Sequence, residues 1–442
     1  MTRKFLGVAL VATISVFTAR ARGASFTAGD LVVNTYAYGD SELENGAPST
    51  ITLQEFSPSG GSAILADTLP TTNGVGGSSN LGIVGEYGGS SEGLIQLSGD
   101  GQYITLTGYS GVPADAGNYS QSTTELAQST DTAVPRVVAL IGQNESINSS
   151  TEMNDVYNTN NPRSAYSANG TTFYVSGQGD GNTTDQGVYY GPIGLNTVST
   201  SNTPTSIYNA HDTRYVTAYN GNLYQSMDTS SGSHTGVYQY SGTPTGAQTP
   251  TLITAANNGL SGTSELFYSP DGFYFANSTT LYVADTGEPK AGPSSGKQTD
   301  GGIQKWTFAN SKWTLQYTLL PSTASESDIW VPSGNPNGAT TGQTGFAGIT
   351  GQVVGGQVDL YAVSYAFGND EPNGLFAIDD TLSSTTGTGE TFTELETAGG
   401  DGGVNFKGVS FAPQAVPEPA SFAVLSLGGA LLLARRKDKK PR

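Results

Sequence analysis

The chain has 442 residues, of which 60 are glycine and none is cysteine, and its formal net charge is −19. The lack of cysteine excludes zinc–thiolate sites, cysteine nucleophiles and disulfide redox chemistry. A chain of this length can bury a sufficient core without disulfides, and its acidic charge argues against nucleic acid and anionic membrane surfaces as partners.

The first residues have the pattern of an export signal. Arg3 and Lys4 form a short basic region, residues 5–19 are apolar or small, and small residues around 19–23 suit a cleavage site. A retained anchor is the weaker alternative, because the apolar run is shorter than the ~20 residues of a spanning helix. We therefore predict a signal peptide over residues 1–23.

The central part, residues 24–413, is predicted to be all-β. Short runs rich in Tyr, Val, Thr, Phe and Ile alternate with Gly, Asn, Asp, Ser and Pro. A strand–turn–strand pattern recurs, with copies that start at Glu92, Arg163, Arg214, Glu265 and Phe346. In the first four copies an Asp-Gly or Asn-Gly pair predicts a tight hairpin turn, at residues 100–101, 169–170, 220–221 and 271–272.

A third strand follows each hairpin and a fourth closes each unit. The third strands begin near Arg136, Gly187, Gly236, Gly302 and Gly374, and residues 314–321 and 391–398 are examples of the fourth. Units of four antiparallel strands repeated every 51 to 81 residues are typical of a β-propeller.

The two ends of this domain complement each other. The first unit has strands at 31–36, 50–57 and 62–70 but lacks its first strand, and residues 406–413 have the character of that missing strand. Joining them closes the ring and removes exposed strand edges. The count is six blades, or seven if residues 285–345 contain a further pair of strands.

The C-terminal segment, residues 414–442, contains three elements in order. Val416 precedes the triplet Pro417, Glu418 and Pro419; an uncharged stretch over about 420–434 follows; and Arg435, Arg436 and Lys437 form a basic cluster. This order resembles the PEP-CTERM sorting signal, a motif also catalogued as the C-terminal domain of ice-binding proteins, a label that does not establish ice binding. The resemblance implies a hydrophobic helix held in the membrane until an exosortase cleaves at the triplet and sends the protein to the cell surface.

Without both ends, eight basic and 35 acidic residues remain, for a net charge of −27.

Charged residues stand at the starts of several predicted first strands. In a propeller these strands line the central channel, so their starts meet at one face. We predict a binding site at the channel mouth, in which guanidinium groups could bind a carboxylate or sulfate. The residues are Glu92, Arg163, His211, Asp212, Arg214, Glu265 and Lys407. The alternative is that these charges pair with one another and fill the channel, whereas guanidinium faces open to solvent would favour a ligand.

Metal and catalytic signals are weaker. Asp180, Asn182 and Asp185 have oxygen ligands at a spacing that suits Ca²⁺, but an ordinary Asn/Asp turn has the same pattern. His211 and His234 are the only histidines, and no nucleophile elbow accompanies them.

The expected function is that of an exported cell-envelope protein with a non-catalytic binding or structural propeller, associated with exopolysaccharide or the cell surface. The alternative is a calcium-dependent hydrolase or lactonase that uses carboxylates at the channel mouth, by analogy of fold. A scaffold for protein partners is the third possibility.

Overall fold

The computed structural model describes residues 25–37, 46–110, 118–120, 122–181, 184–197, 203–228, 234–254, 269–287, 301–320, 345–365, 373–398 and 404–415. The predicted signal peptide, the sorting motif, Glu265 and Asn182 lie outside these residues. Within them, no helix is long and apolar enough to cross a membrane.

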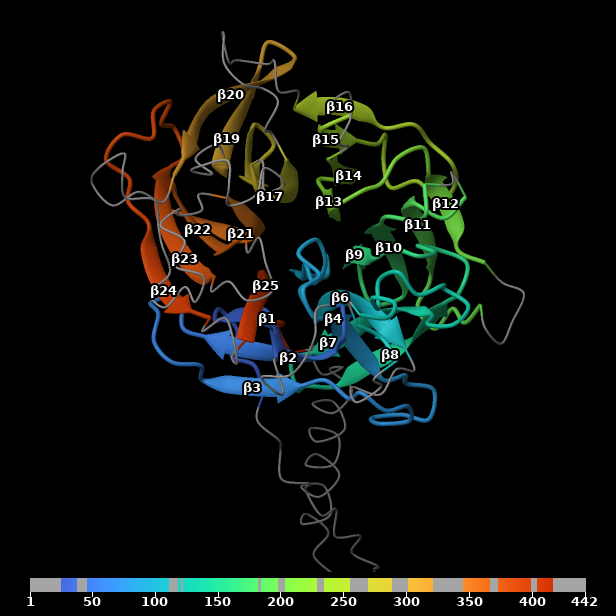
Figure 1. The fold of residues 1–442 in the computed structure, drawn as a ribbon. Coiled ribbons are helices and arrows are strands. Elements are labelled where there is room, and N and C mark those ends of the chain that lie inside the picture. Colours follow the sequence, from blue (N-terminus) through green and yellow to red (C-terminus); the bar gives the residue numbers. More distant parts are fainter. Residues whose placement is uncertain are drawn as a thin grey trace, which may run out of the picture.

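The all-β prediction is confirmed for the residues described, whose regular elements are all strands. Four antiparallel sheets have four strands each, and the sheets stand around a common centre (Figure 1). One contains β9 (Pro162–Tyr166), β10 (Thr172–Gly177), β11 (Gly187–Pro192) and β12 (Thr205–Tyr208). The next contains β13 (Val216–Tyr219), β14 (Asn222–Met227), β15 (Gly236–Gln239) and β16 (Thr251–Thr254). The third contains β17 (Pro270–Asn277), β18 (Thr280–Asp285), β19 (Gly302–Ala309) and β20 (Lys312–Leu319). The fourth contains β21 (Phe346–Val354), β22 (Gln357–Ser364), β23 (Gly374–Thr381) and β24 (Thr393–Thr397).

The remaining nine strands form one sheet that contains both ends of the domain. Its order is β25-β1-β2-β4-β6-β7-β8, with β3 paired to β2 and β5 paired to β6. The strands are β1 (Leu31–Ala37), β2 (Pro48–Phe56), β3 (Leu65–Thr68), β4 (Ile83–Glu86), β5 (Gln96–Leu97), β6 (Tyr103–Ser110), β7 (Arg136–Gly142), β8 (Ile147–Met153) and β25 (Val404–Phe411). β25 pairs with β1 along its whole length, so the predicted union of the last strand with the first is confirmed.

Three of the four predicted hairpin turns lie where the sequence placed them, but only the turn at Asn220-Gly221 has two residues, whereas residues 98–102 and 167–171 form longer turns. Asn220 (φ +46°) and Gly221 (φ +78°) both adopt the left-handed conformation that this two-residue turn requires. The exception is Asp271-Gly272, which lies inside β17 instead of in a turn. There the chain reverses after Asn277, whose side-chain oxygen accepts the Thr279 N–H over 2.8 Å. The prediction was wrong because Asp271 is buried at the start of the strand, where it faces Arg214.

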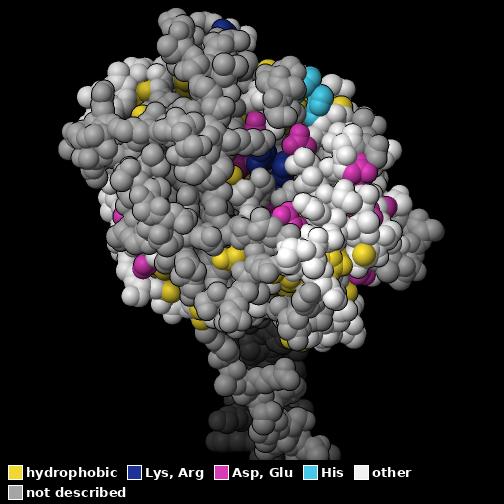
Figure 2. All heavy atoms as spheres, viewed as in Figure 1, with side chains coloured by type: hydrophobic (Ala, Val, Ile, Leu, Met, Phe, Trp, Pro, Cys, Tyr) yellow, Lys and Arg dark blue, Asp and Glu magenta, His cyan; other side chains and the backbone are white. Residues whose placement is uncertain are grey.

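One face of the molecule is hollowed near its centre, and basic and acidic side chains lie in the hollow (Figure 2). The innermost strands approach closely there through glycines. A Cβ at Gly408 would lie 2.7 Å from the Ile95 nitrogen, and one at Gly348 would lie 2.8 Å from the Gly408 Cα. Both distances are shorter than a methyl group allows.

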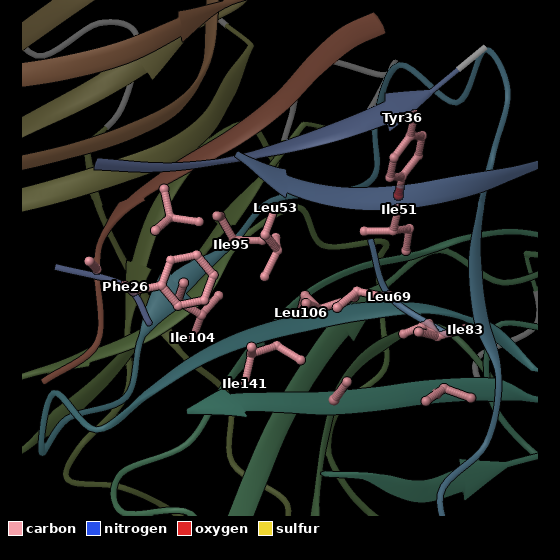
Figure 3. Packing of buried hydrophobic residues seen from close by; sticks show 14 residues of the cluster. Phe26, Tyr36, Ile51, Leu53, Leu69, Ile83, Ile95, Ile104, Leu106 and Ile141 are labelled. Carbon is pink, nitrogen blue, oxygen red and sulfur yellow. The ribbon is translucent and has the colours of Figure 1, made fainter. Parts of the chain in front are cut away.

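Apolar side chains fill the space within and between the sheets. Figure 3 shows Ile51 and Leu53 of β2 facing Ile104 and Leu106 of β6 in the largest buried cluster. Each such side chain contributes roughly 1.5–3 kcal/mol when it is fully removed from water. This core fixes the positions of the inner strands and therefore of the charged residues at their starts.

Candidate functional site

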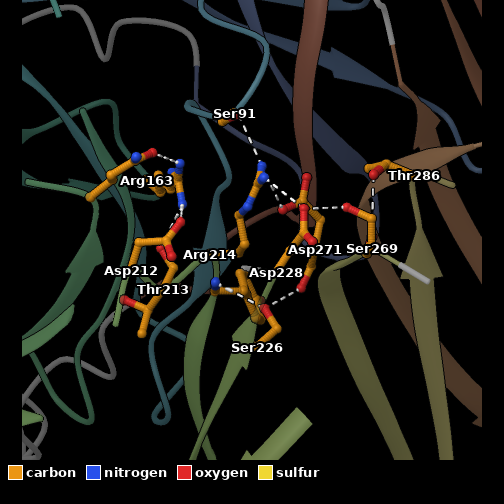
Figure 4. A network of polar contacts seen from close by, with 12 residues as sticks. Ser91, Arg163, Asp212, Thr213, Arg214, Ser226, Asp228, Ser269, Asp271 and Thr286 are labelled. Carbon is orange, nitrogen blue, oxygen red and sulfur yellow. Dashed lines mark hydrogen bonds and ion pairs between the residues drawn. The ribbon is translucent and has the colours of Figure 1, made fainter. Parts of the chain in front are cut away.

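Three inner strands bring charged residues together at the hollowed face. Arg163 lies at the start of β9, Arg214 just before β13 and Asp271 at the start of β17. Figure 4 shows the two arginine side chains side by side, with carboxylates around them. We refer to the set as the arginine site; it consists of Ser91, Arg163, Asp212, Arg214, Asp228 and Asp271.

Arg163 is locked in place by its neighbours. Its side chain is 3% exposed, and Nη1 lies 3.1 Å from Asp212 Oδ2. The same guanidinium donates to the Thr213 carbonyl over 3.3 Å and to the Gln178 side-chain oxygen. Burial, together with the neighbouring charge of Arg214, lowers the pKa of Arg163, and Asp212 opposes this shift.

Arg214 bridges two carboxylates and a hydroxyl. Nη2 lies 2.9 Å from Asp228 Oδ2 and Nη1 lies 3.7 Å from Asp271 Oδ1. Nη1 also donates to the Ser91 hydroxyl over 2.9 Å. Burial alone would lower the pKa of Arg214, but Asp271, Asp228 and Asp212 together raise it.

Asp271 differs from the other two acids of the site. Burial raises its pKa to about 6, although Arg214 and Arg163 pull in the opposite direction. Asp228 is held instead by the Ser269 hydroxyl, which donates to Oδ2 over 2.6 Å. The outer acids are partly accessible, because the Asp212 side chain is 18% exposed and that of Asp228 is 16% exposed.

A second set of ionisable residues, the buried glutamate cluster, adjoins this site and contains Tyr36, Glu86, Glu92, Tyr109 and Lys407. Glu92 accepts the Glu86 N–H over 2.6 Å and the Tyr109 hydroxyl over 2.8 Å. Lys407 donates to the Gly89 carbonyl over 3.1 Å, and its Nζ lies 5.3 Å from the centre of the Tyr36 ring. Burial raises the pKa of Glu86 to about 8 and that of Glu92 to about 7, and it lowers the pKa of Lys407 to about 8.

The predicted ring of charge is therefore divided into two groups. Arg163, Asp212 and Arg214 belong to the arginine site, whereas Glu92 and Lys407 belong to the buried glutamate cluster. Lys407 lies inside β25 and not at its start, which corrects its predicted position. Ser91 and Glu92 are adjacent in the loop between β4 and β5, and this loop links the two groups.

His211 lies beside the site and not among its ion pairs. Its ring stacks on that of His234 with 3.8 Å between centroids, and the Tyr208 ring follows at 6.3 Å. The two imidazoles are the cyan side chains near the hollow in Figure 2. Burial and the neighbouring His234 lower the pKa of His211.

The sequence prediction missed six residues of the two groups, namely Tyr36, Glu86, Ser91, Tyr109, Asp228 and Asp271. Asp271 was assigned to a turn because an Asp-Gly pair is a strong turn signal. Asp228 directly follows β14, the second strand of its sheet. Charged residues just after second strands, as well as those just before first strands, are therefore the signal that points to this face.

The predicted calcium site is described only in part. The Asp180 N–H donates to Asp185 Oδ2 over 3.4 Å, and burial raises the pKa of Asp185. Among the residues that the structure describes, no group of three His, Cys, Asp or Glu side chains could hold a metal ion. Calcium binding at Asp180, Asn182 and Asp185 stays a prediction.

No protein-family model and no curated protein matches this chain. Several solved structures, including the following three, are similar over most of its length. Two are candidate 6-phosphogluconolactonases, from Bacteroides uniformis (11% identity, 84% of this chain and 82% of that chain, TM-score 0.34) and from Bacteroides fragilis (10%, 87% and 99%, 0.36). The third is a fungal alcohol oxidase of the AA5 family in complex with copper (11%, 88% and 92%, 0.36).

Proposed function

We propose that the domain is a six-bladed β-propeller. The nine-stranded sheet then counts as two blades, β25-β1-β2-β3 and β5-β6-β7-β8, linked by the short strand β4. The contacts between neighbouring units support a closed ring. β25 contacts β5, β5 contacts β9, β9 contacts β13, β14 contacts β17, β17 contacts β21, and β21 contacts β25.

The protein, on this proposal, is exported and sorted by its C-terminal signal. β25 runs beside the other inner strands, and the Gln414 N–H donates to the carbonyl of Gly101 in the β5–β6 turn over 2.8 Å. The chain therefore leaves the domain on the face of the hairpin turns, opposite the arginine site. A protein that is held at the membrane through its C-terminal segment would therefore present the arginine site on the side away from the membrane. The mature protein recovered from cells is expected to end near Pro417 by intact mass, and an uncut C-terminus would contradict the sorting proposal.

The function that the geometry supports best is non-catalytic binding of a polysaccharide at the arginine site. The observation that carries this proposal is the pair of partly exposed carboxylates, Asp212 and Asp228, each held in position by a buried arginine. The pairing of both arginines agrees with the alternative in which the charges pair with one another and fill the channel. That alternative does not explain why the side chains of Asp212 and Asp228 are partly exposed in a hollow. Rigid acceptors of this kind can bind sugar hydroxyls without an entropic cost of ordering them.

Retention of the mature protein on the host's own exopolysaccharide tests the proposal. The wild-type protein is expected to be retained, and the double variant Asp212→Ala/Asp228→Ala is expected to bind at least tenfold more weakly. Asp359→Asn on β22 is the control, because Asp359 hydrogen-bonds Gln352 near the β21–β22 turn, on the far face. Lack of retention on this and on every other polysaccharide tested would overturn the proposed function.

A further inference from the structure

The atoms that the arginine site presents to solvent are mainly acceptors. Both guanidinium groups lie beneath, with side chains only 3% and 8% exposed, and the acids Asp212 and Asp228 lie above them. Three carboxylates surround two guanidinium groups, so no surplus positive charge is available to an incoming anion.

The arginines are also not free to turn towards a ligand. Arg163 binds a carboxylate, a main-chain carbonyl and an amide oxygen, and Arg214 binds two carboxylates and a hydroxyl. An acidic ligand would have to displace a carboxylate from a buried guanidinium, and breaking a buried pair is costly. The net charge of −27 over residues 24–413 adds a repulsion that acts at a distance.

Flat rings stand next to these acceptors. His211 precedes Asp212 in the chain, and its ring is stacked with that of His234. Burial and the neighbouring His234 lower the pKa of His211, which favours the uncharged imidazole. A sugar presents both hydroxyl donors and an apolar face of C–H groups, so acceptors beside an uncharged ring match its chemistry.

Resting on the proposed function, we propose that the arginine site selects uncharged sugar chains and rejects acidic ones. Asp212 and Asp228 accept hydrogen bonds from sugar hydroxyls, and the His211–His234 pair packs against the sugar ring. The arginines act as positioning residues, since they hold the carboxylates and do not contact the ligand.

Matched polymers test this selectivity. Dextran is compared with carboxymethyl dextran, and hydroxyethyl cellulose with carboxymethyl cellulose, by the retardation of the mature protein in native gels that contain each polymer. Retention is expected only on the neutral member of a pair, with at least a tenfold difference in apparent affinity. Equal or stronger retention on the acidic member would overturn the inference and leave the proposed function standing. Retention on none of these polymers or on the host polysaccharide would overturn both.

The variant Asp212→Asn separates selectivity from simple loss of structure. It keeps a side-chain oxygen but removes the counter-charge of Arg163, so retention on the neutral polymer should fall and retention on its carboxymethyl partner should rise. Asp359→Asn makes the same change of net charge on the far face and should alter neither. Unfolding of the variant would lower retention on both polymers. A folded variant whose retention on the carboxymethyl polymer does not rise would contradict the proposal.

Discussion

Lys305 and Asp380 form the most deeply buried ion pair among the residues described. Nζ lies 2.8 Å from Oδ2, and neither side chain is exposed. The Tyr317 hydroxyl donates to the other carboxylate oxygen over 2.6 Å, and Lys305 also donates to the carbonyls of Thr381 and Ser384. Because Lys305 belongs to β19 and Asp380 to β23, the pair joins two neighbouring sheets.

Asp380→Asn is expected to lower the free energy of unfolding by about 3–5 kcal/mol, because the buried ammonium loses the carboxylate that lies 2.8 Å from it. Equilibrium denaturation in urea measures the loss. The double variant Lys305→Met/Asp380→Asn removes both charges while the amide oxygen can still accept from Tyr317. It should recover most of the stability. A double variant no more stable than the single one would show that the charge pair is not the cause.

In three of the sheets the third strand begins with a glycine, and the same structural constraint requires glycine at each of these positions. A Cβ at Gly187 would lie 2.0 Å from the Tyr208 carbonyl oxygen, and a Cβ at Gly236 would lie 2.3 Å from that of Thr254. At Gly302 the corresponding distance, to the Leu319 oxygen, is 2.5 Å. In each case the fourth strand passes so close to the third that a side chain cannot be accommodated.

Gly236→Ala is therefore expected to destabilise the protein by at least about 1–3 kcal/mol, the cost of a non-glycine residue at φ +148°. The clash with a main-chain oxygen adds to this cost, and thermal unfolding measures the sum. Gly246→Ala is the control, because nothing lies within 4 Å of its Cβ position. Equal melting temperatures for the two variants would contradict the explanation that glycine is required here by the close approach of the fourth strand.

Elements that repeat could be predicted from the sequence, and elements that occur once could not. The hairpins around Gly101, Gly170 and Gly221 were predicted because each carries its own turn signal. β4 has no counterpart in the other units and consists of four residues, so no periodic signal marks it.

The same limit applies to the arginine site. Arg163 and Arg214 could be predicted because position in a repeat is a local property. Asp271, a partner of Arg214, could not, because this pairing depends on which strands are neighbours in space. Asp271 also shows that a strong turn signal gives way when burial and an ion pair favour a strand.

At the scale of the whole molecule, the loop between β4 and β5 lies near the common centre of the sheets, where it is drawn in light blue (Figure 1). It carries Glu92 into the buried glutamate cluster, and burial raises the pKa of Glu92 to about 7 and that of Glu86 to about 8. In the folded state both carboxyls therefore keep their protons at a pH where the unfolded chain, with ordinary values near 4.5, has lost them. By linkage, the stability that they contribute is fully present below about pH 4.5 and is lost as the pH rises to about 8.

The melting temperature is expected to fall between pH 5 and pH 8 more steeply in the wild type than in Glu92→Gln. The substitution removes one titrating group and lessens the repulsion that helps to raise the pKa of Glu86. Other acids with raised pKa values, such as Asp155 and Asp271, remain in both proteins, so the difference between the two curves isolates the cluster. Parallel curves would contradict this assignment.

The pairing of β25 with β1 can form only late in the synthesis of the chain. A chain is made from its N-terminus, so β1, which ends at Ala37, waits for β25, which begins at Val404. At ~5–20 residues per second this wait lasts roughly 20–70 s. Until then Leu31 and Val33 lack the cover of Phe406 and Val409, and β1 has an open edge. The pairing of β25 with β1 is thus among the last contacts that become available to the chain, and any chain that ends before Val404 never acquires it.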